Sequence, residues 1–258
     1  KASNEVKLVA ARLRLVQGKP EDAKVLADEV LARSSNSWEA QLVLAQAFLD
    51  AGDPAEALKR IGSVRPPKPA AELFVLKGKI LEHNGKHGEA RSEYQRAIAV
   101  EAGNLEAHFL LGRLLAYAGQ AKQAIAELEL VTSSTDAFPR AYLNMGRAQR
   151  DLGENEDALA SFAKALELDA SIFEAHYLTG RIHLERNKGA KAVTELQAAT
   201  VDEAKSELWY PEAWLFLGRA HEKVGKRGAA KKAYQKFLEV APETHSSRAS
   251  VERTLKSL

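Results

Sequence analysis

The sequence predicts an all-α protein built from repeated pairs of antiparallel helices, and three observations lead to this class. A turn residue recurs at spacings of 34, 33, 34, 34, 34 and 38 residues. An alanine follows every turn residue by five positions, and a small residue, alanine or glycine, precedes it by seven. The turn residues are Gly18, Gly52, Gly85, Gly119, Gly153, Asn187 and Gly225. A fixed period of this length is typical of helical repeats that stack to bury their apolar sides.

The stretch from 139 to 169 shows the repeat unit most clearly. Its first helix is expected over about 139–152 and ends at Gly153, since glycine readily takes the left-handed conformation that closes a helix. The second helix is expected over about 156–168, with Ala158 and Phe162 four residues apart on one side. Neither short helix can bury its apolar side chains alone, so each helix pair is expected to pack against the neighbouring pairs.

The period divides the chain into seven predicted repeats followed by a final helix. The repeats are expected at about 4–37, 38–70, 71–104, 105–138, 139–172, 173–210 and 211–244. The last segment, 245–258, is predicted to be a capping helix, because Val251, Leu255 and Leu258 share one side of it.

Two irregularities interrupt the period. The proline run 65–69 predicts an early end of the second helix of repeat two, because proline removes a backbone donor and clashes with the preceding turn. Four extra residues lengthen repeat six between Ala199 and Pro211 and include Leu208, Trp209 and Tyr210. We expect these residues to extend a helix and pack; an exposed contact surface is the alternative.

Small residues on both helices of a pair are expected to let the two backbones approach closely. Aromatic residues at fixed offsets from them are predicted to fill the core. These are Phe74, Tyr142 and Trp214 on first helices, and Tyr94, Phe162 and Tyr234 on second helices.

The spacing resembles that of the tetratricopeptide repeat family. The last repeat matches the family pattern best, with Trp214, Leu217 and Gly218 on its first helix, and with Ala230, Tyr234 and Pro242 after the turn. The resemblance covers about residues 4–244. It implies an α-solenoid, a right-handed superhelix formed by a single array over 1–258, that acts as a protein-interaction scaffold.

By this resemblance, the second, fifth, sixth, ninth, twelfth and thirteenth positions of each repeat line a concave groove. The ninth position is basic in six of seven repeats, which predicts a basic ladder: Arg12, Gln46, Lys79, Arg113, Arg147, Arg181 and Arg219. The fifth position forms an apolar row: Leu8, Leu42, Val75, Phe109, Leu143, Tyr177 and Leu215. Such a groove would hold apolar side chains of a partner and donate hydrogen bonds to its carboxylates or carbonyls.

The second position is Glu in six of the seven repeats, so an internal lattice of Glu–Arg pairs that only fixes repeat geometry stays open as an alternative. The fifth repeat breaks this pattern with Arg140. The strongest basic patch is therefore predicted from Arg113, Arg140, Arg147, Arg150 and Arg181. Asn144 alone agrees with the subgroup of the family that clamps a C-terminal carboxylate through Lys and Asn, so that clamp is not expected.

Composition and motifs argue against a catalytic, metal or nucleic-acid site in this chain. The net charge is +2, which gives no general attraction to nucleic acid, and no cysteine is present for disulfides or thiolate zinc sites. His83 and His87 have four-residue spacing, but Gly85 interrupts the helix between them. Phosphate loops and nucleophile elbows are absent. We expect no enzyme activity, no cofactor, no metal and no membrane insertion.

The predicted function is that of a scaffold or adaptor whose groove binds a protein or peptide partner, in particular an acidic segment. The alternative is an architectural spacer or assembly subunit of a bacterial cell-envelope or motility complex, including small-GTPase adaptor roles. The chain starts without methionine or a signal peptide, so we expect it to be part of a larger protein. A cytoplasmic location is favoured only marginally over a periplasmic one.

Overall fold

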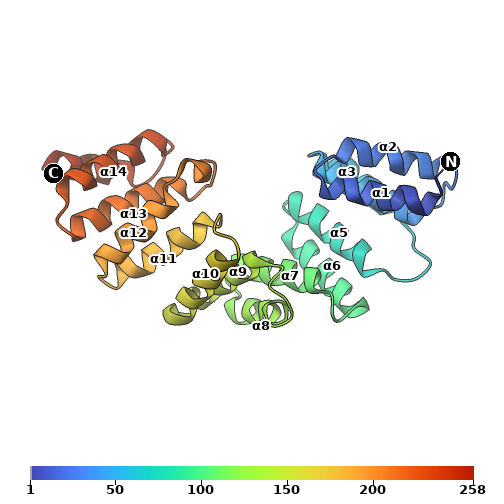
Figure 1. The fold of residues 1–258 in the computed structure, drawn as a ribbon, viewed down its shortest axis with the longest axis horizontal. Coiled ribbons are helices and arrows are strands. Elements are labelled where there is room, and N and C mark those ends of the chain that lie inside the picture. Colours follow the sequence, from blue (N-terminus) through green and yellow to red (C-terminus); the bar gives the residue numbers. More distant parts are fainter. Residues whose placement is uncertain (1) are drawn as a thin grey trace. The chain divides into compact units, whose positions relative to one another are not determined.

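The computed structural model describes residues 2–258 as helices joined by short turns, with no strand in that range (Figure 1). The predicted all-α class is confirmed. Contacts divide the chain into two compact units, 1–117 and 118–258. Their boundary falls inside the predicted fourth repeat, so a single array over the whole chain stays a prediction.

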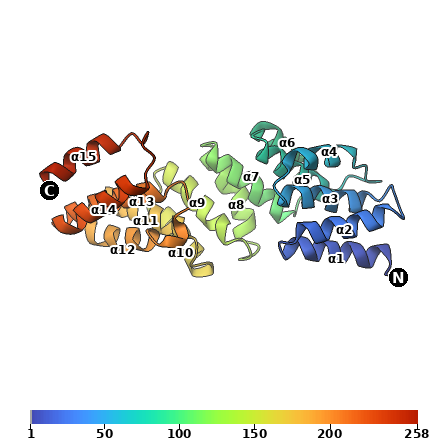
Figure 2. The same cartoon turned by 90° about the horizontal axis from the view of Figure 1, so that it is seen from above.

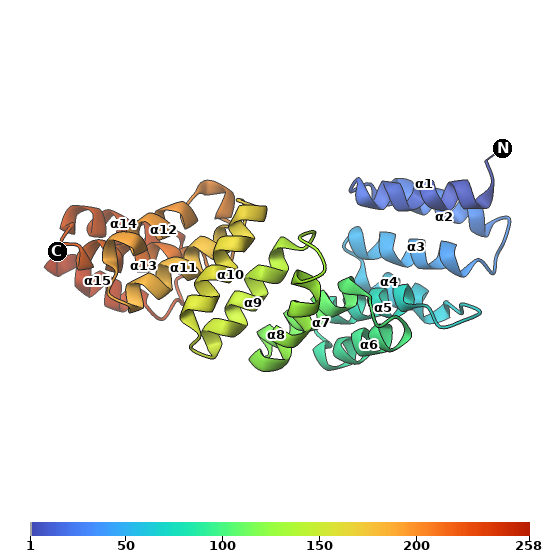
Figure 3. The same cartoon turned by 60° about the horizontal axis from the view of Figure 1, so that its bottom comes forward.

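The first unit consists of helices that pack in sequence. They are α1 (Asn4–Val16), α2 (Pro20–Leu31), α3 (Trp38–Asp50), α4 (Pro54–Ser63), α5 (Ala71–His83), α6 (His87–Val100) and α7 (Leu105–Tyr117). Each helix contacts the next one, and α1, α3 and α5 also contact each other in order, as successive rows (Figure 3). The first helices of these repeats therefore lie side by side.

The second unit continues the same construction. It contains α8 (Ala121–Thr132), α9 (Pro139–Asp151), α10 (Asn155–Leu168), α11 (Phe173–Glu185), α12 (Gly189–Ala199), the short 3-10 helix η1 (Asp202–Ala204), α13 (Tyr210–Lys223), α14 (Arg227–Val240) and α15 (Arg248–Ser257). The last helix, α15, contacts α14 (Figure 2) and buries Val251 against Tyr234 and Phe237. A capping role for 245–258 stays a prediction.

All seven predicted turn residues have the left-handed backbone conformation. The six glycines have φ between 68° and 82°, and Asn187 has φ of 58°. A residue with a side chain is strained in this region, and asparagine tolerates it better than most. The recurring glycine or asparagine in the sequence therefore marks the positions where the backbone has a positive φ.

In four of the first helices a glycine forms a seat for a large side chain of the second helix: Gly78, Gly146, Gly180 and Gly218. A Cβ atom added to Gly146 would lie 2.5 Å from Cε1 of Phe162 and 3.1 Å from the carbonyl oxygen of Ala158. The equivalent Cβ atoms at Gly78 and Gly218 would lie 2.4 Å from the rings of Tyr94 and Tyr234, respectively. The sequence predicted close approach of two backbones, whereas the main contact is between backbone and ring.

The predicted core aromatics fall into two groups. The rings on second helices, Tyr94, Phe162 and Tyr234, are at most 3% exposed. The rings on first helices, Phe74, Tyr142 and Trp214, are only partly buried. Of these, Phe74 lies under the guanidinium of Arg96, whose Cζ is 4.2 Å from the ring centroid. The second-helix rings thus form the centre of each pair, and the first-helix rings lie at its edge.

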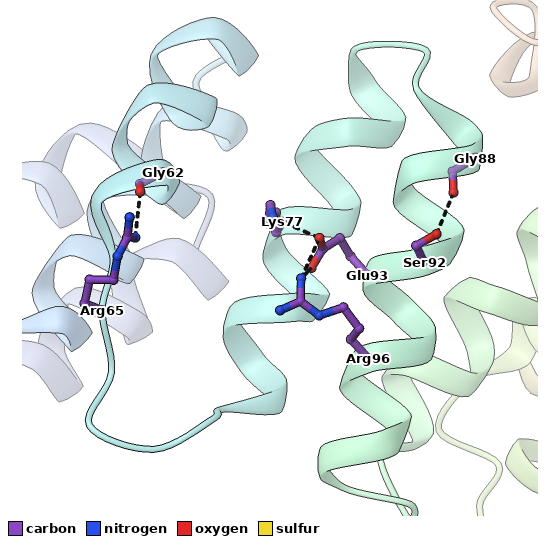
Figure 4. A network of polar contacts seen from close by, with 7 residues as sticks. All are labelled: Gly62, Arg65, Lys77, Gly88, Ser92, Glu93 and Arg96. Carbon is purple, nitrogen blue, oxygen red and sulfur yellow. Dashed lines mark hydrogen bonds and ion pairs between the residues drawn. The ribbon is translucent and has the colours of Figure 1, made fainter.

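Helix α4 ends at Ser63, before the proline run, as predicted. Polar contacts hold the end of α4 and join the two helices of the next pair (Figure 4). Arg65 donates from Nη1 to the carbonyl oxygens of Gly62 and Val64, at 2.7 and 2.8 Å. In the next pair, Glu93 of α6 is only 7% exposed and accepts from Lys77 of α5 at 2.8 Å and from Arg96 at 3.0 Å. This buried carboxylate links α5 to α6.

The four extra residues of repeat six form a turn and η1 rather than a longer helix. Tyr210 begins α13 and is 2% exposed, and Trp209 packs on the ring of Tyr177. Leu208 is 96% exposed. The predicted packing role therefore applies to two of the three residues, and the predicted helix extension was wrong.

Candidate functional site

The basic ladder of the first unit is engaged in ion pairs. Arg12 pairs with Glu72 at 2.9 Å and Lys79 pairs with Glu106 at 2.5 Å. Each of these pairs joins a ninth-position base to a second-position carboxylate of a later predicted repeat. The internal lattice that the sequence left open therefore exists at these positions, between side chains that are still 30% to 51% exposed.

Arg113 uses a different partner, Glu82, at the twelfth position of the preceding predicted repeat. Its Nη2 donates to both carboxylate oxygens of Glu82 at 2.8 Å, and the hydroxyl of Tyr94 donates to the same carboxylate at 2.8 Å. The Cζ of Arg113 also lies 5.9 Å from the ring centroid of Phe109. This arginine is therefore held by Glu82 and Phe109, and Tyr94 holds the carboxylate of Glu82 in turn.

Two adjoining pockets follow the first helices of this unit. One has a volume of about 380 Å³ and the other about 720 Å³, and Gln46 and Lys79 line both. The first is lined by Arg12, Leu15, Leu42, Val43, Gln46, Glu72, Val75, Leu76, Lys79, Asn104 and Glu106. The second includes Leu49, Asp50, Glu82, His83, His87, Leu110 and Arg113. Side chains of α1, α3, α5 and α7 therefore form a continuous trough, which we call the α1–α7 trough.

The apolar row is mostly a buried floor. Leu143, Tyr177 and Leu215 are 2% to 6% exposed, whereas Leu8 and Phe109 are partly exposed. Asn144 is 3% exposed and donates from Nδ2 to the carbonyl oxygen of Arg140 at 2.8 Å. These side chains support the groove and leave little surface of their own for a partner.

The basic residues of the second unit are only partly compensated. Arg147 pairs with Glu174, and Arg150 pairs with Asp151 at 3.2 Å. Arg140 is exposed. Within residues 118–258 as the structure describes them, Arg181 and Arg219 form no ion pair.

These two arginines lie over aromatic rings instead. The Cζ of Arg181 is 5.6 Å from the ring centroid of Tyr177 and 4.9 Å from that of Phe216. Arg219 lies 5.1 Å from the centroid of Phe216. Cations over ring faces are attracted by the ring quadrupole, and the ring leaves the N–H edge of the guanidinium available for other contacts.

Three rings around Arg181 form a compact cluster. Trp209 stacks on Tyr177 with a centroid distance of 5.2 Å and an interplanar angle of 12°, and Phe216 lies 6.2 Å from Tyr177 at 53°. Burial raises the pKa of Tyr177, and the nearby Arg181 guanidinium opposes this shift. The Tyr177 hydroxyl accepts a weak hydrogen bond from Nη1 of Arg181 at 3.4 Å.

Several donors of this surface are buried without a protein acceptor. They are Nη1 of Arg150, Nε of Arg181 and Nε1 of Trp209. The sequence analysis singled out Arg150 and Arg181 but missed Phe216, which occupies a sixth position. It expected Trp209 to pack, with an exposed contact surface as the alternative.

The histidines do not assemble a metal site. His108 bonds from Nε2 to the carbonyl oxygen of Ala102 at 3.0 Å, and Nδ1 of His176 lies 2.7 Å from Glu195. Burial lowers the pKa of His183 and of His221. No group of three or more metal-ligating side chains occurs among the described residues, and none of their helices is long and apolar enough to cross a membrane.

Stacked helix pairs with left-handed turns, and with a trough along their first helices, define a helical-repeat scaffold. Comparison with protein families identifies the kind of repeat. A model described as tetratricopeptide repeat-like domain matches residues 3–110, and three tetratricopeptide repeat models match residues 81–149, 143–207 and 211–244. The chain belongs to the tetratricopeptide repeat family, whose fold serves protein–protein interaction.

Similar proteins share the fold at low sequence identity. Human protein O-mannosyl-transferase TMTC1 is 25% identical over 181 residues, which are 67% of this chain and 20% of that protein. The C-terminal part of a tetratricopeptide repeat protein from Cytophaga hutchinsonii has a TM-score of 0.62 at 21% identity, covering 95% of this chain and 98% of that one. The APC/C hetero-tetramer Cut9-Hcn1 has a TM-score of 0.73 at 17% identity, covering 84% and 43%. The chain spans half or less of the length of its curated relatives.

Proposed function

We propose that this chain is a non-enzymatic scaffold that binds an extended segment of a partner protein along its first helices. The observation that carries the proposal is the α1–α7 trough, whose two pockets share Gln46 and Lys79. Its walls present charged and amide groups at the ninth position and apolar side chains below them. A trough of this kind suits backbone carbonyls and alternating side chains of a peptide.

The ion pairs in the trough do not prevent binding. Arg12 and Glu72 are each about half exposed, at 47% and 51%. Exposed pairs contribute only about 0 to 1 kcal/mol each, so a partner that offers its own carboxylate or carbonyl can replace one at low cost. In the absence of a partner, the Arg12–Glu72 and Lys79–Glu106 ion pairs keep the side chains of the trough in place.

Site-specific photo-crosslinking tests this proposal. A photo-reactive amino acid at Gln46, in the middle of the trough, is expected to capture a partner from native lysate. The same amino acid at Lys59, whose side chain is 77% exposed on α4 and outside both pockets, serves as the matched control. Lys79→Glu, with unchanged helicity and melting, should abolish the Gln46 cross-link. Equal capture at both positions, or capture that survives Lys79→Glu, would remove the trough from the proposal.

An architectural role is the second candidate, and the ion pairs favour it. Arg12 of α1 pairs with Glu72 of α5, and Arg147 of α9 pairs with Glu174 of α11, so the lattice ties separate helix pairs together. In a spacer or assembly subunit these pairs would serve stiffness alone. Arg147→Gln would then lower the melting temperature while no concave position yields a partner cross-link.

A further inference from the structure

We propose that two copies of this chain associate through the exposed side of α1, with the two α1 helices packed antiparallel. This side carries Val6, Val9, Leu13 and Val16, which we call the α1 stripe. The inference goes beyond the proposed scaffold function and does not rest on it, because the four side chains lie outside both pockets of the α1–α7 trough.

The α1 stripe is an apolar row that faces solvent. Its side chains are 58%, 68%, 54% and 86% exposed, in chain order. Helix α1 is also the outermost row of its unit (Figure 3). The spacings of 3, 4 and 3 residues place all four side chains on one side of the helix, as in the a/d seam of a coiled coil. A row of this kind suits a second helix that inserts its own apolar side chains.

The later repeats show that this side of a first helix is a helix-packing surface. The tenth position of the repeat is 54% exposed at Leu13 but at most 8% exposed in the six later repeats. In those repeats the first helix packs against the preceding second helix, for example α3 against α2 and α13 against α12. The six later residues are Ala47, Ile80, Leu114, Ala148, Ile182 and Ala220. The α1 stripe is therefore a surface of the same kind that is still exposed.

A second copy of the chain is the occupant that the surface of this protein supports. The other large apolar side chains that are exposed in the described residues stand singly on six other segments: Val25, Val100, Tyr117, Leu130, Leu152 and Leu208. They form no second row, so the α1 stripe of another copy is the one comparable surface that this chain offers to itself. Two identical stripes match because each contains both seam positions.

Geometry favours the antiparallel arrangement. It places Val6 opposite Val16 of the second copy, and Val9 opposite Leu13 of the second copy, so that all four side chains find a partner. The small Ala10 then lies at the centre, where it lets the backbones approach. Antiparallel helices also bring the positive end of each helix dipole to the negative end of the other, whereas parallel helices bring like ends together.

The charges beside the stripe are compatible with this packing. Arg12 would approach Arg12 of the second copy, but Glu72 balances each of these charges at 2.9 Å. At the two ends of the contact, Glu5 would lie near the neutral Gln17 of the second copy. The packing therefore brings no uncompensated pair of like charges together.

The size of the contact sets the expected affinity. A helix of 13 residues is about 20 Å long, and a pair of such helices buries less than the roughly 800 Å² per partner of a standard interface. We therefore expect a dissociation constant in the micromolar range.

Sedimentation velocity of the full chain over about 1 to 500 μM tests the proposal. The mass of the wild type is expected to rise from that of one chain to that of two. Val9→Glu should weaken association at least about tenfold, because a buried charge without a partner is costly. Val100→Glu makes the same change at an exposed valine at the end of α6 and should associate like the wild type. Circular dichroism and melting confirm that each variant is folded.

A mixing experiment tests the direction of the helices. Val9→Glu and Leu13→Lys are each expected to stay monomeric alone. Their equimolar mixture should associate, because antiparallel packing sets the new carboxylate of one copy opposite the new ammonium group of the other. Parallel packing would set each position opposite its own counterpart, and mixing would then restore nothing.

Three outcomes would overturn the proposal. The first is a wild type that stays monomeric over the whole range, and the second is association that Val9→Glu leaves unchanged. The third is association that Val9→Glu removes and mixing does not restore, since the helices would then not be antiparallel. If the monomer instead binds vesicles of phosphatidylcholine and phosphatidylserine, and Val9→Glu abolishes this binding, the α1 stripe belongs to a lipid surface and not to a second copy.

Discussion

The glycine seat for the aromatic ring makes a quantitative prediction about stability. In Gly146→Ala, the new Cβ atom would lie 2.5 Å from Cε1 of Phe162, whereas carbon atoms in contact prefer about 3.5 to 4.0 Å. The ring is fully buried, and the carbonyl oxygen of Ala158 lies 3.1 Å from the same Cβ, so retreat needs a shift of the helix itself. Overpacking of this kind costs about 1 to 3 kcal/mol.

The same substitution also has a favourable term. Alanine is preferred to glycine inside a helix by about 0.5 to 1 kcal/mol. The net change at Gly146 is therefore smaller than the overpacking cost alone. Gly228→Ala in α14 provides the matched control, because no atom lies within 4 Å of its added Cβ. It should be neutral or stabilising, so the difference between the two variants isolates the contact with Phe162.

Urea unfolding of the full chain, followed by circular dichroism at 222 nm, measures this difference. We expect Gly146→Ala to be about 1 to 3 kcal/mol less stable than Gly228→Ala. The second repeat uses Ala45 with Ile61 at the equivalent positions, so the double variant Gly146→Ala with Phe162→Ile should be more stable than the two single changes predict by addition. Equal stability of both glycine variants, or strict additivity in the double variant, would refute the argument that Gly146 leaves the space that the Phe162 ring needs.

Three further predictions concern buried polar groups. Glu93→Gln removes the charge that Lys77 contacts at 2.8 Å, and should lower the free energy of unfolding by about 1 to 3 kcal/mol in urea titrations. Burial, and then the hydrogen bond to Glu222, raise the pKa of the Tyr234 hydroxyl. The unfolded chain therefore loses this proton first, so stability should fall above about pH 10, and less so in Tyr234→Phe. Burial lowers the pKa of His221, so its contribution to the free energy of unfolding is present above about pH 6.5 and is lost as the pH falls. Melting temperatures measured between about pH 8 and 5 should therefore fall, and they should fall less steeply in His221→Gln.

The repeat architecture was predictable because its determinants are local. A left-handed turn requires glycine or asparagine within one short segment, so Gly153 and Asn187 are visible in the sequence without knowledge of distant parts. The final helix, α15, also follows from one apolar side of a single segment. Helix ends agreed closely, with α9 ending at Asp151 where the sequence placed the end near 152.

The pairing of charges was not predictable to the same degree. Arg12 reaches Glu72, which lies two predicted repeats further along, and Arg113 turns back to Glu82 of the preceding one. These choices depend on the rotation between neighbouring helix pairs, and sequence spacing does not contain that angle. The stack of Trp209 on Tyr177 likewise depends on the path of the turn before α13. The helix pairs could therefore be predicted from the sequence, while the charge pairing and ring contacts of the first helices could not.

The contact between the glycine and the ring also limits which helices can be exchanged between repeats by recombination. A recombination event that moved only a second helix would place Tyr94 against Ala45, where no glycine makes room for the ring. Moving a first helix alone would set Gly78 opposite Ile61 and leave a void. An exchange between a glycine–ring pair and the Ala45–Ile61 pair therefore keeps the match only when both helices of a pair move together.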